Sequence, residues 1–430
     1  MTLRRLELSI ERLSKSGDGV AEVAGRAVFV PGTVPGDRVL AEVFEQGKAV
    51  RGEVLEVLSP GPGRRSPICP LADRCGGCDW MHLTEDTQHE HKRHIVVSAL
   101  EHLGGLAPDA YELLPFVFSP MPYNSRRRAV LHPVKGRLGF FGKRSHTHVE
   151  VDLCPALTPP LESLPGELAD ALGTALKDVD EVHLLEVGGQ ISFALMAKGA
   201  LRPKHREAAQ ALIRDELVSG VILVPGAGKG APELHGAAVL EDDGVLYRPD
   251  AFAQANADVN RPLVEHAVAE LAAGPDDSVL ELYSGNGNFT FPLAASAASV
   301  LAVESSTVSL GLAQQGARKL GFTNIRFVQG DCEKFAKGLV KESKRFDRIL
   351  LDPPRTGAPG IGEWASRLLA ARVVYIACDP GALARDAADL VAHGFVPRTV
   401  RLFDLFPQTR HIEVVMSFSR EGPGKGRPGS

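Results

Sequence analysis

The chain has 430 residues, of which 44% are hydrophobic and 23% charged, a balance typical of a soluble globular protein of two or three domains. The net charge of −5 excludes nucleic-acid binding through bulk charge, so any such binding must rely on local basic patches. No apolar run is long enough to cross a membrane, and the charged start MTLRRLELSIERL is unlike a signal peptide, so we expect a cytoplasmic protein without a membrane partner.

Residues 1–59 predict a small all-β domain. The segments LELSIERL, RAVFVPG and VRGEVLEVL alternate with the period of a strand, and glycine and proline turns separate them. Several short strands without helix signals favour a barrel of the OB type. This stretch resembles the TRAM domain, an RNA-binding module of RNA-modifying enzymes. A barrel that only packs against its neighbour is the alternative.

A cysteine-rich segment, ICPLADRCGGCDW, opens the next part of the chain, residues 60–250. Cys69, Cys75 and Cys78 lie close enough in sequence to converge on one metal centre, and Cys154 is the natural fourth ligand. Four thiolates can hold zinc or a [4Fe–4S] cluster, and the spacing does not decide between them. A fourth cysteine argues against a radical enzyme, which leaves one iron free.

The remainder of residues 60–250 predicts an α+β domain. A helix is expected over residues 85–103, with its four histidines on a solvated face, and further helices are expected in ELADALGTALKDV and PKHREAAQALIRDELV. Basic and aromatic side chains alternate through SRRRAVLHPVKGRLGFFGKRSHTHVEVDL, which favours a surface for single-stranded RNA over an ordinary solvated sheet face. The basic residues of this surface are Arg126, Arg127, Arg128, Lys135, Arg137, Lys143 and Arg144.

Residues 251–420 predict a doubly wound α/β domain. VLELYSGNGNFTFPLA reads as a strand, a glycine loop and a helix, in which Gly285 and Gly287 allow close approach of a ligand. Glu281, in the first strand, suits a ligand with an amino group. Acidic residues also end the next three predicted strands, which places them at one crevice along the carboxyl edge of the sheet. They are Glu304, where ribose hydroxyls can bind, Asp331 and Asp352.

The glycine loop favours S-adenosylmethionine as the ligand. It lacks the third glycine of the dinucleotide motif GxGxxG and the lysine of a P-loop, which argues against NAD and ATP. The tail EGPGKGRPGS, residues 421–430, is expected to be disordered.

Three further motifs carry candidate chemistry. AFAQAN places Gln254 and Asn256 before the first strand, VVYIACDPGALARD places Cys378 at the end of the fifth, and HIEVV places Glu413 at the start of the last. Catalytic groups collect at such strand ends. A buried strand cysteine and a surface salt bridge are the respective alternatives for Cys378 and Glu413.

Taken together, these motifs resemble the RNA uracil-5-methyltransferases that act on 23S rRNA and on the T loop of tRNA. The resemblance covers nearly the whole chain and implies a Rossmann-like class I methyltransferase domain. In it, ELYSGNGNF with Glu281, Tyr283, Gly285 and Gly287 is the first cofactor motif, and Glu304 binds the ribose. Gln254, Asp331 and Asp352 also belong to the cofactor and substrate site. Ala377 stands where the family usually has serine.

The same resemblance implies the mechanism and the partners. Cys378 is the nucleophile that adds to C6 of uracil, Glu413 is the base, and the four cysteines match the [4Fe–4S] site of the ribosomal members. The substrate is then RNA, with 23S rRNA favoured and a T-loop uridine of tRNA as the alternative, and the protein is expected to be a monomer. Two other functions stay open: an amino-methyltransferase, since DPPR resembles the Asn/Asp-Pro-Pro motif, and a non-enzymatic RNA-binding protein with a vestigial methyltransferase domain.

Overall fold

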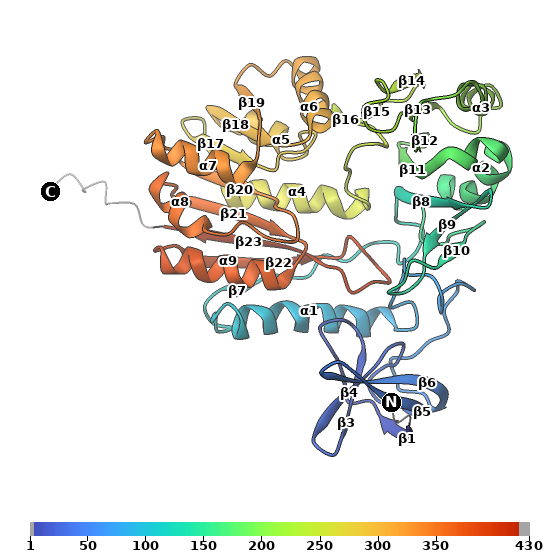
Figure 1. Ribbon diagram of the computed structural model, residues 1–430. Helices are drawn as coiled ribbons and strands as arrows, with labels where there is room; N and C mark the ends of the chain where they lie inside the picture. The colour runs from blue at the N-terminus through green and yellow to red at the C-terminus, as the bar shows by residue number, and fades with distance from the viewer. Residues whose placement is uncertain (1–3, 421–430) are drawn as a thin grey trace.

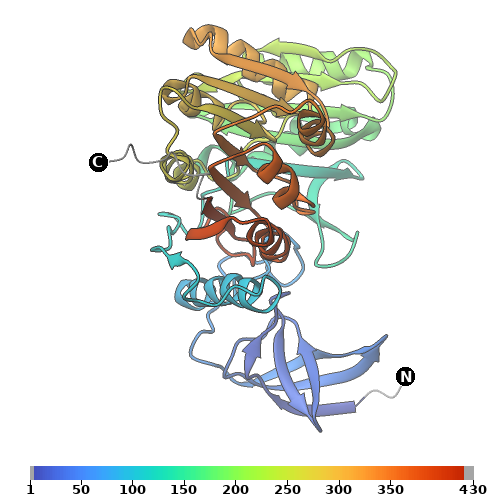
Figure 2. The same ribbon diagram turned by 90° about the vertical axis from the view of Figure 1, so that its left-hand side faces the viewer.

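The computed structural model describes residues 4–420, so the tail 421–430 that the sequence predicts to be disordered lies outside the described residues. Most of this range folds around three β-sheets of six, seven and eight strands. Helices pack against the seven-stranded and the eight-stranded sheet. Figures 1 and 2 show the six-stranded sheet as a separate lobe at one end of the molecule, with helix α1 beside it.

The N-terminal lobe is the barrel that the sequence predicts. Its strands lie in the order β1-β5-β6-β4-β3-β2, and β5 (Arg38–Gln46) alternates buried and partly exposed residues because one face covers the barrel core. That core contains Leu8, Val28, Val30 and Val39. The other strands are β1 (Arg4–Ser9), β2 (Arg12–Leu13), β3 (Gly19–Val23), β4 (Arg26–Val30) and β6 (Ala49–Ser59).

The central sheet has the order β10-β9-β8-β11-β12-β13-β14, and helices α2 and α3 pack against its buried face. The aliphatic core of this sheet explains why its strands contain continuous apolar runs, such as Leu184-Leu185. On the neighbouring strand, Phe193 pairs with Leu184 and Ser192 pairs with Leu185. The elements are β8 (Arg128–Val134), β9 (Arg137–Phe141), β10 (His148–Glu150), α2 (Leu164–Leu172), β11 (Val179–Val187), β12 (Gln190–Ala197), α3 (Pro203–Arg214), β13 (Gly220–Val224) and β14 (Glu233–Gly236). A hairpin of β15 (Leu240–Asp242) and β16 (Val245–Tyr247) follows.

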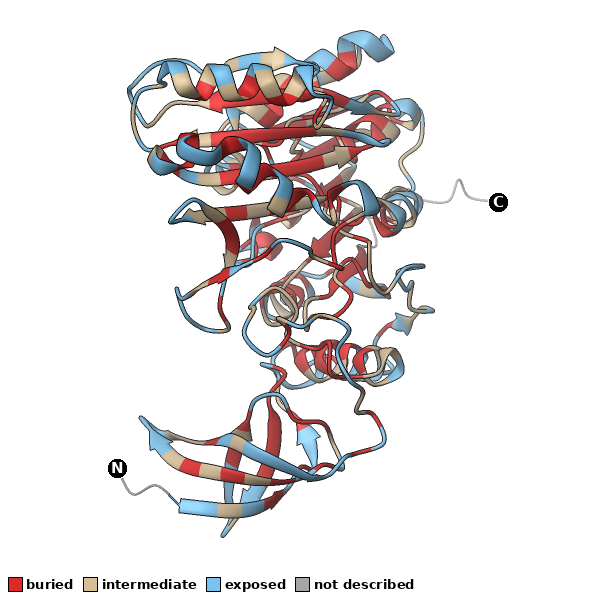
Figure 3. Cartoon of the chain, turned by 90° about the vertical axis from the view of Figure 1, so that its right-hand side faces the viewer, coloured by how far each residue is buried: buried red, intermediate tan, exposed pale blue. Residues whose placement is uncertain are grey.

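The eight-stranded sheet has the order β19-β18-β17-β20-β21-β23-β22-β7. Strands β17 to β21 are mutually parallel, whereas β23 inserts antiparallel between β21 and β22. Most residues of β17, β20, β21 and β23 are buried. Figure 3, in which the central sheet faces the viewer, shows the same contrast there between buried strands and helices with exposed outer faces. The elements are α4 (Ala257–Leu271), β17 (Ser278–Leu282), α5 (Thr290–Ser296), β18 (Ser299–Glu304), α6 (Thr307–Leu320), β19 (Ile325–Gln329), α7 (Cys332–Lys341), β20 (Arg348–Leu351), α8 (Ile361–Arg367), β21 (Arg372–Ala377), α9 (Pro380–Ala392), β22 (Val396–Phe403) and β23 (Glu413–Ser419).

Two elements that precede the central sheet in sequence belong to the eight-stranded sheet in space. Strand β7 (Glu112–Leu113) pairs in parallel with β22 at the sheet edge. Helix α1 (Glu85–His102) packs Val96, Ala99 and Leu100 into the same core as Leu383 of α9. Within residues 4–420, none of the helices is long and apolar enough to span a membrane.

The sequence expectation for the histidines of α1 is only partly correct. His94 and His102 are exposed, but His89 and His91 are half-buried. His89 Nε2 lies 3.3 Å from an oxygen of Asp404, and the His91 ring contacts Trp80 edge-on. The reason is that α1 lies between the barrel and the eight-stranded sheet, as Figure 1 shows, so two of its faces are covered.

Candidate active site and cysteine cavity

A topological switch point defines the candidate crevice. From β17 the chain continues to β18 and β19 on one side of the sheet, and then returns to β20 and β21 on the other side. In an open α/β sheet, ligands bind at the carboxyl ends of the strands next to such a point. The predicted residues Glu281, Glu304, Asp352 and Cys378 all lie at this edge.

The glycine loop after β17 has the conformation that its residues predict. Gly285 and Gly287 have φ angles of 57° and 101°, and Tyr283 also adopts a left-handed φ of 63°. A Cβ atom on Gly287 would lie only 2.6 Å from the ring of Phe291, so any larger residue would displace that ring. The loop is tied to β18 because the amide of Gly285 donates to Glu304 Oε2 at 3.0 Å.

Glu281 is the most unusual group of the crevice. It is fully buried, and neither carboxyl oxygen has a partner at hydrogen-bond distance among the described residues, although the Thr290 hydroxyl lies near enough to lower its pKa. Burial is the largest effect, and with the charges of Asp352 and Glu304 it raises the pKa of Glu281 to about 8. A buried acceptor without a partner is costly, so this carboxyl group is suited to a ligand that brings a donor, such as an ammonium group.

Cys378 and Glu413 lie close together at the edge of the sheet. Ala377, the last residue of β21, pairs with Val414 of antiparallel β23, and Cys378 and Glu413 are the residues next to this pair. The charge of Glu413 reaches the Cys378 thiol. The sheet therefore brings together a thiol and a carboxyl group that are 35 positions apart in sequence.

Asp352 joins this pair from β20, and the three groups influence one another. Burial, aided by the charges of Glu413 and Asp352, raises the pKa of the Cys378 thiol to about 12, and Arg355 opposes this shift. Burial and the charge of Asp352 likewise raise the pKa of Glu413, and burial raises that of Asp352 to about 7. Such clustered shifts are typical of functional sites.

The predicted site residues Gln254, Asn256 and Asp331 each make hydrogen bonds within the protein. Gln254 is buried near the start of α4, and its backbone carbonyl accepts a hydrogen bond from Arg127 Nε at 3.0 Å. Asn256 caps α4 through the amide of Val259 and donates to Ser119 Oγ at 2.9 Å. Asp331 caps α7 through the amide of Lys334 at 2.9 Å, so its carboxylate already has a structural role.

The four N-terminal cysteines converge. Cys69, Cys75, Cys78 and Cys154 all line one cavity of about 220 Å³ between the cysteine segment and the central sheet. Within residues 4–420, no group of three or more His, Cys, Asp or Glu side chains is arranged to hold a metal ion. A single zinc ion, with Zn–S bonds of about 2.3 Å, needs its ligands in direct mutual contact. The four cysteines thus line one shared cavity.

Arg126 and Arg127, which the sequence predicts on an RNA-binding surface, instead contact other parts of the protein. Arg127 is 4% exposed and stacks 4.7 Å over the Tyr247 ring, and an Arg126 nitrogen donates to Cys78 Sγ at 3.6 Å. The expectation that Arg127 lies on a surface is therefore wrong. The reason is that this segment leads into β8, an inner strand of its sheet, and packs against the segment before α4.

A large groove of about 1210 Å³ instead brings together charged groups of both signs from several parts of the chain. Its walls come from the barrel, the cysteine segment, the turn after β9 and the loop before β23. The charged residues that line it are Asp18, Glu53, Arg64, Asp73, Asp79, Lys143, Arg144 and Arg410. Arg64 and Arg410 carry no local sequence signal for this role, because only the fold brings them to one groove.

Family models match both ends of the chain. The model described as tRNA (Uracil-5-)-methyltransferase matches residues 237–421, and the TRAM domain model matches residues 1–57. Curated relatives match almost the whole length. The 23S rRNA (uracil(1939)-C(5))-methyltransferase RlmD of Alkalilimnicola ehrlichii is 36% identical, with 96% of each chain covered. The protein of the same name from Pseudomonas putida is 34% identical, with 96% of this chain and 94% of the relative covered.

A solved structure supports the fold. The tRNA (uracil-54, C5)-methyltransferase of Pyrococcus abyssi, determined with S-adenosyl-L-homocysteine, superposes with a TM-score of 0.72 and covers 96% of this chain and 100% of its own. At 22% identity this likeness establishes the architecture only. The long, high-coverage matches to the curated relatives establish more: the chain belongs to the RNA uracil-5-methyltransferases, the enzymes that methylate C5 of uridine in RNA.

Proposed function

We propose that this protein methylates C5 of a uridine in 23S rRNA, with Cys378 as the nucleophile and Glu413 as the base. The observation that carries the residue assignment is their proximity at the ends of β21 and β23 at the carboxyl edge of the sheet. The choice of 23S rRNA is supported by the names of the full-length relatives, which specify uracil 1939 of that RNA. A tRNA uridine is the second candidate, favoured by the name of the structural relative.

The chemistry requires a thiol beside the base. C5 of uracil is a weak nucleophile until the sulfur of Cys378 adds to C6 and forms an enolate. Because the pKa of the Cys378 thiol is raised to about 12 in the free protein, the thiol is protonated at neutral pH and must lose its proton as the sulfur adds to C6. The neighbouring Asp352 carboxylate, whose pKa is about 7, is the group that accepts this proton. Arg355 lowers the pKa of the thiol and is therefore the neighbouring charge that favours the thiolate.

Glu413 completes the reaction. When bound, S-adenosylmethionine supplies an electrophilic methyl group, which C5 of the enolate attacks. A proton then remains on C5, and the Glu413 carboxylate removes it while the C6–sulfur bond breaks and the Cys378 thiolate leaves. The buried position of Glu413, which is 4% exposed, excludes water that would otherwise compete for the carboxylate.

The cofactor site follows from the crevice groups. We assign the ammonium group of S-adenosylmethionine to the unpartnered Glu281 carboxyl and the ribose hydroxyls to Glu304. Glu304 Oε1 accepts from Ser305 and Ser306, whereas Oε2 accepts only from the Gly285 amide and keeps a free lone pair. Gly285 and Gly287 leave room for the ligand beside the loop. Tyr283, Gln254, Asp331 and Asp352 are assigned to the surrounding wall. Asp352, whose charge reaches both Cys378 and Glu413, and Gln254 are also assigned to the uracil edge.

The four cysteines are proposed to hold a [4Fe–4S] cluster. Their shared cavity of about 220 Å³ and the absence, within residues 4–420, of a three-ligand site for a single ion support a cluster over zinc. The chain supplies a thiolate from each of four positions, and Arg126 donates to Cys78 Sγ, an arrangement that stabilises negative sulfur. Such a cluster would join the cysteine segment to the central sheet.

The RNA is proposed to lie in the large groove between the barrel and the loop before β23. Its basic residues are Arg64, Lys143, Arg144 and Arg410. Arg64, Arg144 and Arg410 already pair with Asp37, Asp18 and Asp79, so RNA phosphates would share these cations with the carboxylates. The target base must leave its stack to reach Cys378. We further propose that the protein acts as a monomer in the cytoplasm, where ribosomal RNA is found.

Methylation of purified RNA tests the function. Recombinant protein with radiolabelled S-adenosylmethionine should methylate unmodified 23S rRNA at one uridine, and the site can be mapped by mass spectrometry of nuclease fragments. Equal transfer to unmodified tRNA and none to 23S rRNA would favour the tRNA candidate. Full activity of Cys378→Ala on adenine or on protein glutamine would instead favour an amino-methyltransferase, which needs no thiol nucleophile.

A further inference from the structure

The loop between β22 and β23, residues 404–412, leads directly to the proposed base. Glu413 is the first residue of β23; it pairs with Phe403 of β22 but lies beyond the last pair with β21, Ala377–Val414. The loop that runs from β22 back to Glu413 therefore contributes to the placement of its side chain. Most of the contacts that hold this loop come from residues 65–122, outside the segment 251–420 that contains the other crevice groups.

Gln408 is the centre of these contacts. It is 1% exposed and has a left-handed φ of 66°, a conformation that is uncommon for a residue other than glycine or asparagine. Its amide donates to Gln88 Oε1 at 3.0 Å, and its carbonyl accepts from the amide of Trp80 at 3.0 Å. The backbone of the loop is thus joined to α1 and to the end of the cysteine segment.

The side chain of Gln408 is equally occupied. Its Oε1 accepts from Gln88 Nε2 at 3.0 Å and from Arg65 Nη2 at 2.6 Å, and its Nε2 donates to the carbonyl of Pro122 at 3.1 Å. Each polar atom of this buried amide therefore has a partner, which is the condition under which a buried polar network orients its members.

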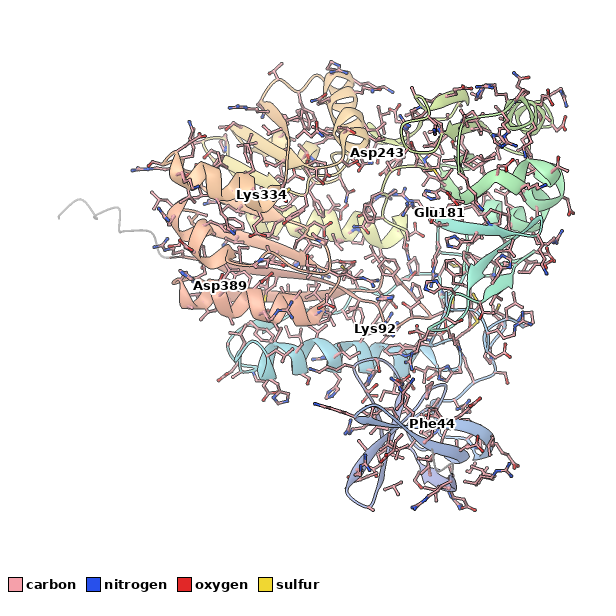
Figure 4. The ribbon with its side chains drawn as sticks, viewed as in Figure 1. Phe44, Lys92, Glu181, Asp243, Lys334 and Asp389 are labelled. Atoms are coloured by element: carbon pink, nitrogen blue, oxygen red, sulfur yellow. The ribbon has the colours of Figure 1, made fainter. Side chains whose placement is uncertain are left out.

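A second contact holds the beginning of the loop. Lys92 of α1, labelled in Figure 4, is fully buried, and its ammonium donates to Asp404 Oδ1 at 2.6 Å and to the carbonyl of Phe406 at 3.0 Å. Asp404 is itself 1% exposed. The loop is consequently attached to α1 at two places, whereas the nucleophile Cys378 lies between β21 and α9 and does not belong to it.

We infer that Gln408 is a positioning residue for the last step of methylation: it holds the loop so that Glu413 reaches the C5 proton. This inference rests on the proposed role of Glu413. Proton removal tolerates little misplacement, because an error of about 1 Å in a reacting group can cost about 100-fold in rate. Addition of Cys378 to C6 and transfer of the methyl group do not use Glu413 as a base. Glu413 acts on the addition only through its charge, which raises the pKa of the thiol, and a Gln408 variant keeps that charge.

The test separates these steps with two RNA substrates. With 5-fluorouridine at the target there is no C5 proton to remove, so formation of the covalent protein–RNA adduct reports attack and methyl transfer only. With ordinary uridine, turnover also requires proton removal. The variants are Gln408→Asn, which tolerates the left-handed backbone but has a shorter side chain, and Gln88→Met, which removes the partner and leaves residue 408 intact.

For both variants we expect turnover on uridine to fall about 10- to 100-fold, with the loss in kcat and little change in KM, while the rate of fluorouridine adduct formation stays within about twofold of wild type. Methylated RNA attached to the protein should also accumulate on denaturing gels. Asn324→Ala is the matched control, because that amide bonds the carbonyls of Ala294 and Ala297 at the opposite edge of the sheet. It should lower the melting temperature without changing the ratio of the two rates.

The outcomes distinguish failure of the positioning role of Gln408 from failure of the proposed role of Glu413. Equal losses of adduct formation and turnover in the Gln408 and Gln88 variants, or turnover at the wild-type rate, would overturn the positioning role. If Glu413→Gln itself accumulates no methylated adduct on uridine RNA, the proposed function of Glu413 fails instead, whatever the Gln408 variants do.

Discussion

Glu413, the first residue of β23, and Cys378, which directly follows β21, lie one residue beyond the Val414–Ala377 pair of these antiparallel strands. The two groups are close enough for the charge of Glu413 to raise the pKa of the Cys378 thiol. Because they belong to different segments, their proposed roles can be separated by mutation.

The first prediction separates nucleophile and base. Cys378→Ala should bind S-adenosylmethionine and RNA but form neither methylated product nor covalent adduct. Glu413→Gln should attack and transfer the methyl group and then stall, because elimination needs the C5 proton removed. Denaturing electrophoresis of methyl-labelled reactions distinguishes the two variants. Wild-type turnover by Glu413→Gln, or a 5-fluorouridine adduct in Cys378→Ala, would contradict the scheme.

The second prediction concerns the acidity of Cys378. The Asp352 carboxylate contributes to raising the pKa of this thiol, so Asp352→Asn should lower that pKa and increase the thiolate fraction at any pH below it. The rate of Cys378 alkylation by iodoacetamide, followed by peptide mass spectrometry between pH 7 and pH 10, should rise at every pH. Asp379→Asn, a substitution at the cap of α9, serves as a control for charge loss nearby. A slower or unchanged reaction in Asp352→Asn would refute the electrostatic argument.

The third prediction contrasts stability with binding at Glu281. In the unfolded chain this group ionises near pH 4.5, whereas in the folded protein its pKa is raised to about 8. Between these values the folded state keeps a proton that the unfolded state releases, so stability falls as pH rises from 4.5 to 8. Glu281→Gln removes this pH-dependent loss of stability. The cofactor-free variant should therefore melt several degrees higher than wild type at pH 8 but not at pH 4.5.

The same substitution should weaken S-adenosylmethionine binding about 10- to 100-fold, because a charge-assisted hydrogen bond to the ammonium contributes about 1.5–3 kcal/mol. Calorimetry measures the affinity, and Glu11→Gln on the exposed surface of the barrel is the control for both measurements. Tighter binding by the Gln variant, or a lower melting temperature at pH 8, would show that Glu281 is not the ammonium partner.

The fourth prediction concerns the cysteine cavity. Protein purified without oxygen should be brown and contain about four iron and four sulfide ions per chain. Cys75→Ser should lose most of this iron, whereas Cys332→Ala, outside the cavity, should keep it. Colourless protein with one zinc ion would exclude the cluster.

The fifth prediction tests the groove. Lys143→Glu and Arg410→Glu should each weaken RNA binding and reduce the steepness of its salt dependence by about one unit, as expected for the loss of a phosphate contact. Arg214→Glu makes the same charge change at the exposed end of α3 and should have no effect. Comparable weakening by all three variants would place the RNA elsewhere.

The sequence was informative wherever one short segment determines the geometry. The run Val279–Leu282 followed by Gly285 and Gly287 predicts a strand and a tight loop, and both are present. Acidic residues at strand ends could be placed at one sheet edge because the carboxyl ends of parallel strands coincide. The proximity of Cys378 and Glu413 was not visible, since it depends on β23 inserting between β21 and β22.

Long-range contacts also explain the remaining differences. Gln88 and Lys92 look like ordinary solvated residues of an amphipathic helix, and only the loop of residues 404–412 makes them buried partners. Arg127 lies in a basic run that suggests a surface, yet the segment before α4 covers it. In each case the covering segment lies far away in sequence, where no periodicity or spacing can indicate it.

The pairing of β7 with β22 has a consequence for synthesis on the ribosome. Glu112 and its partner Thr399 are roughly 290 residues apart, and at about 5–20 residues per second the interval between them takes roughly 15–60 s to translate. During that time α1 and β7 have left the ribosome while the sheet that they cover does not yet exist. The apolar face of α1 is therefore exposed on the nascent chain, where it is available to chaperones. The central sheet, whose strands are contiguous in sequence, can fold within this interval. It then lies between α1 and β7 on one side and the strands β17 to β23 on the other until β23 has been synthesised.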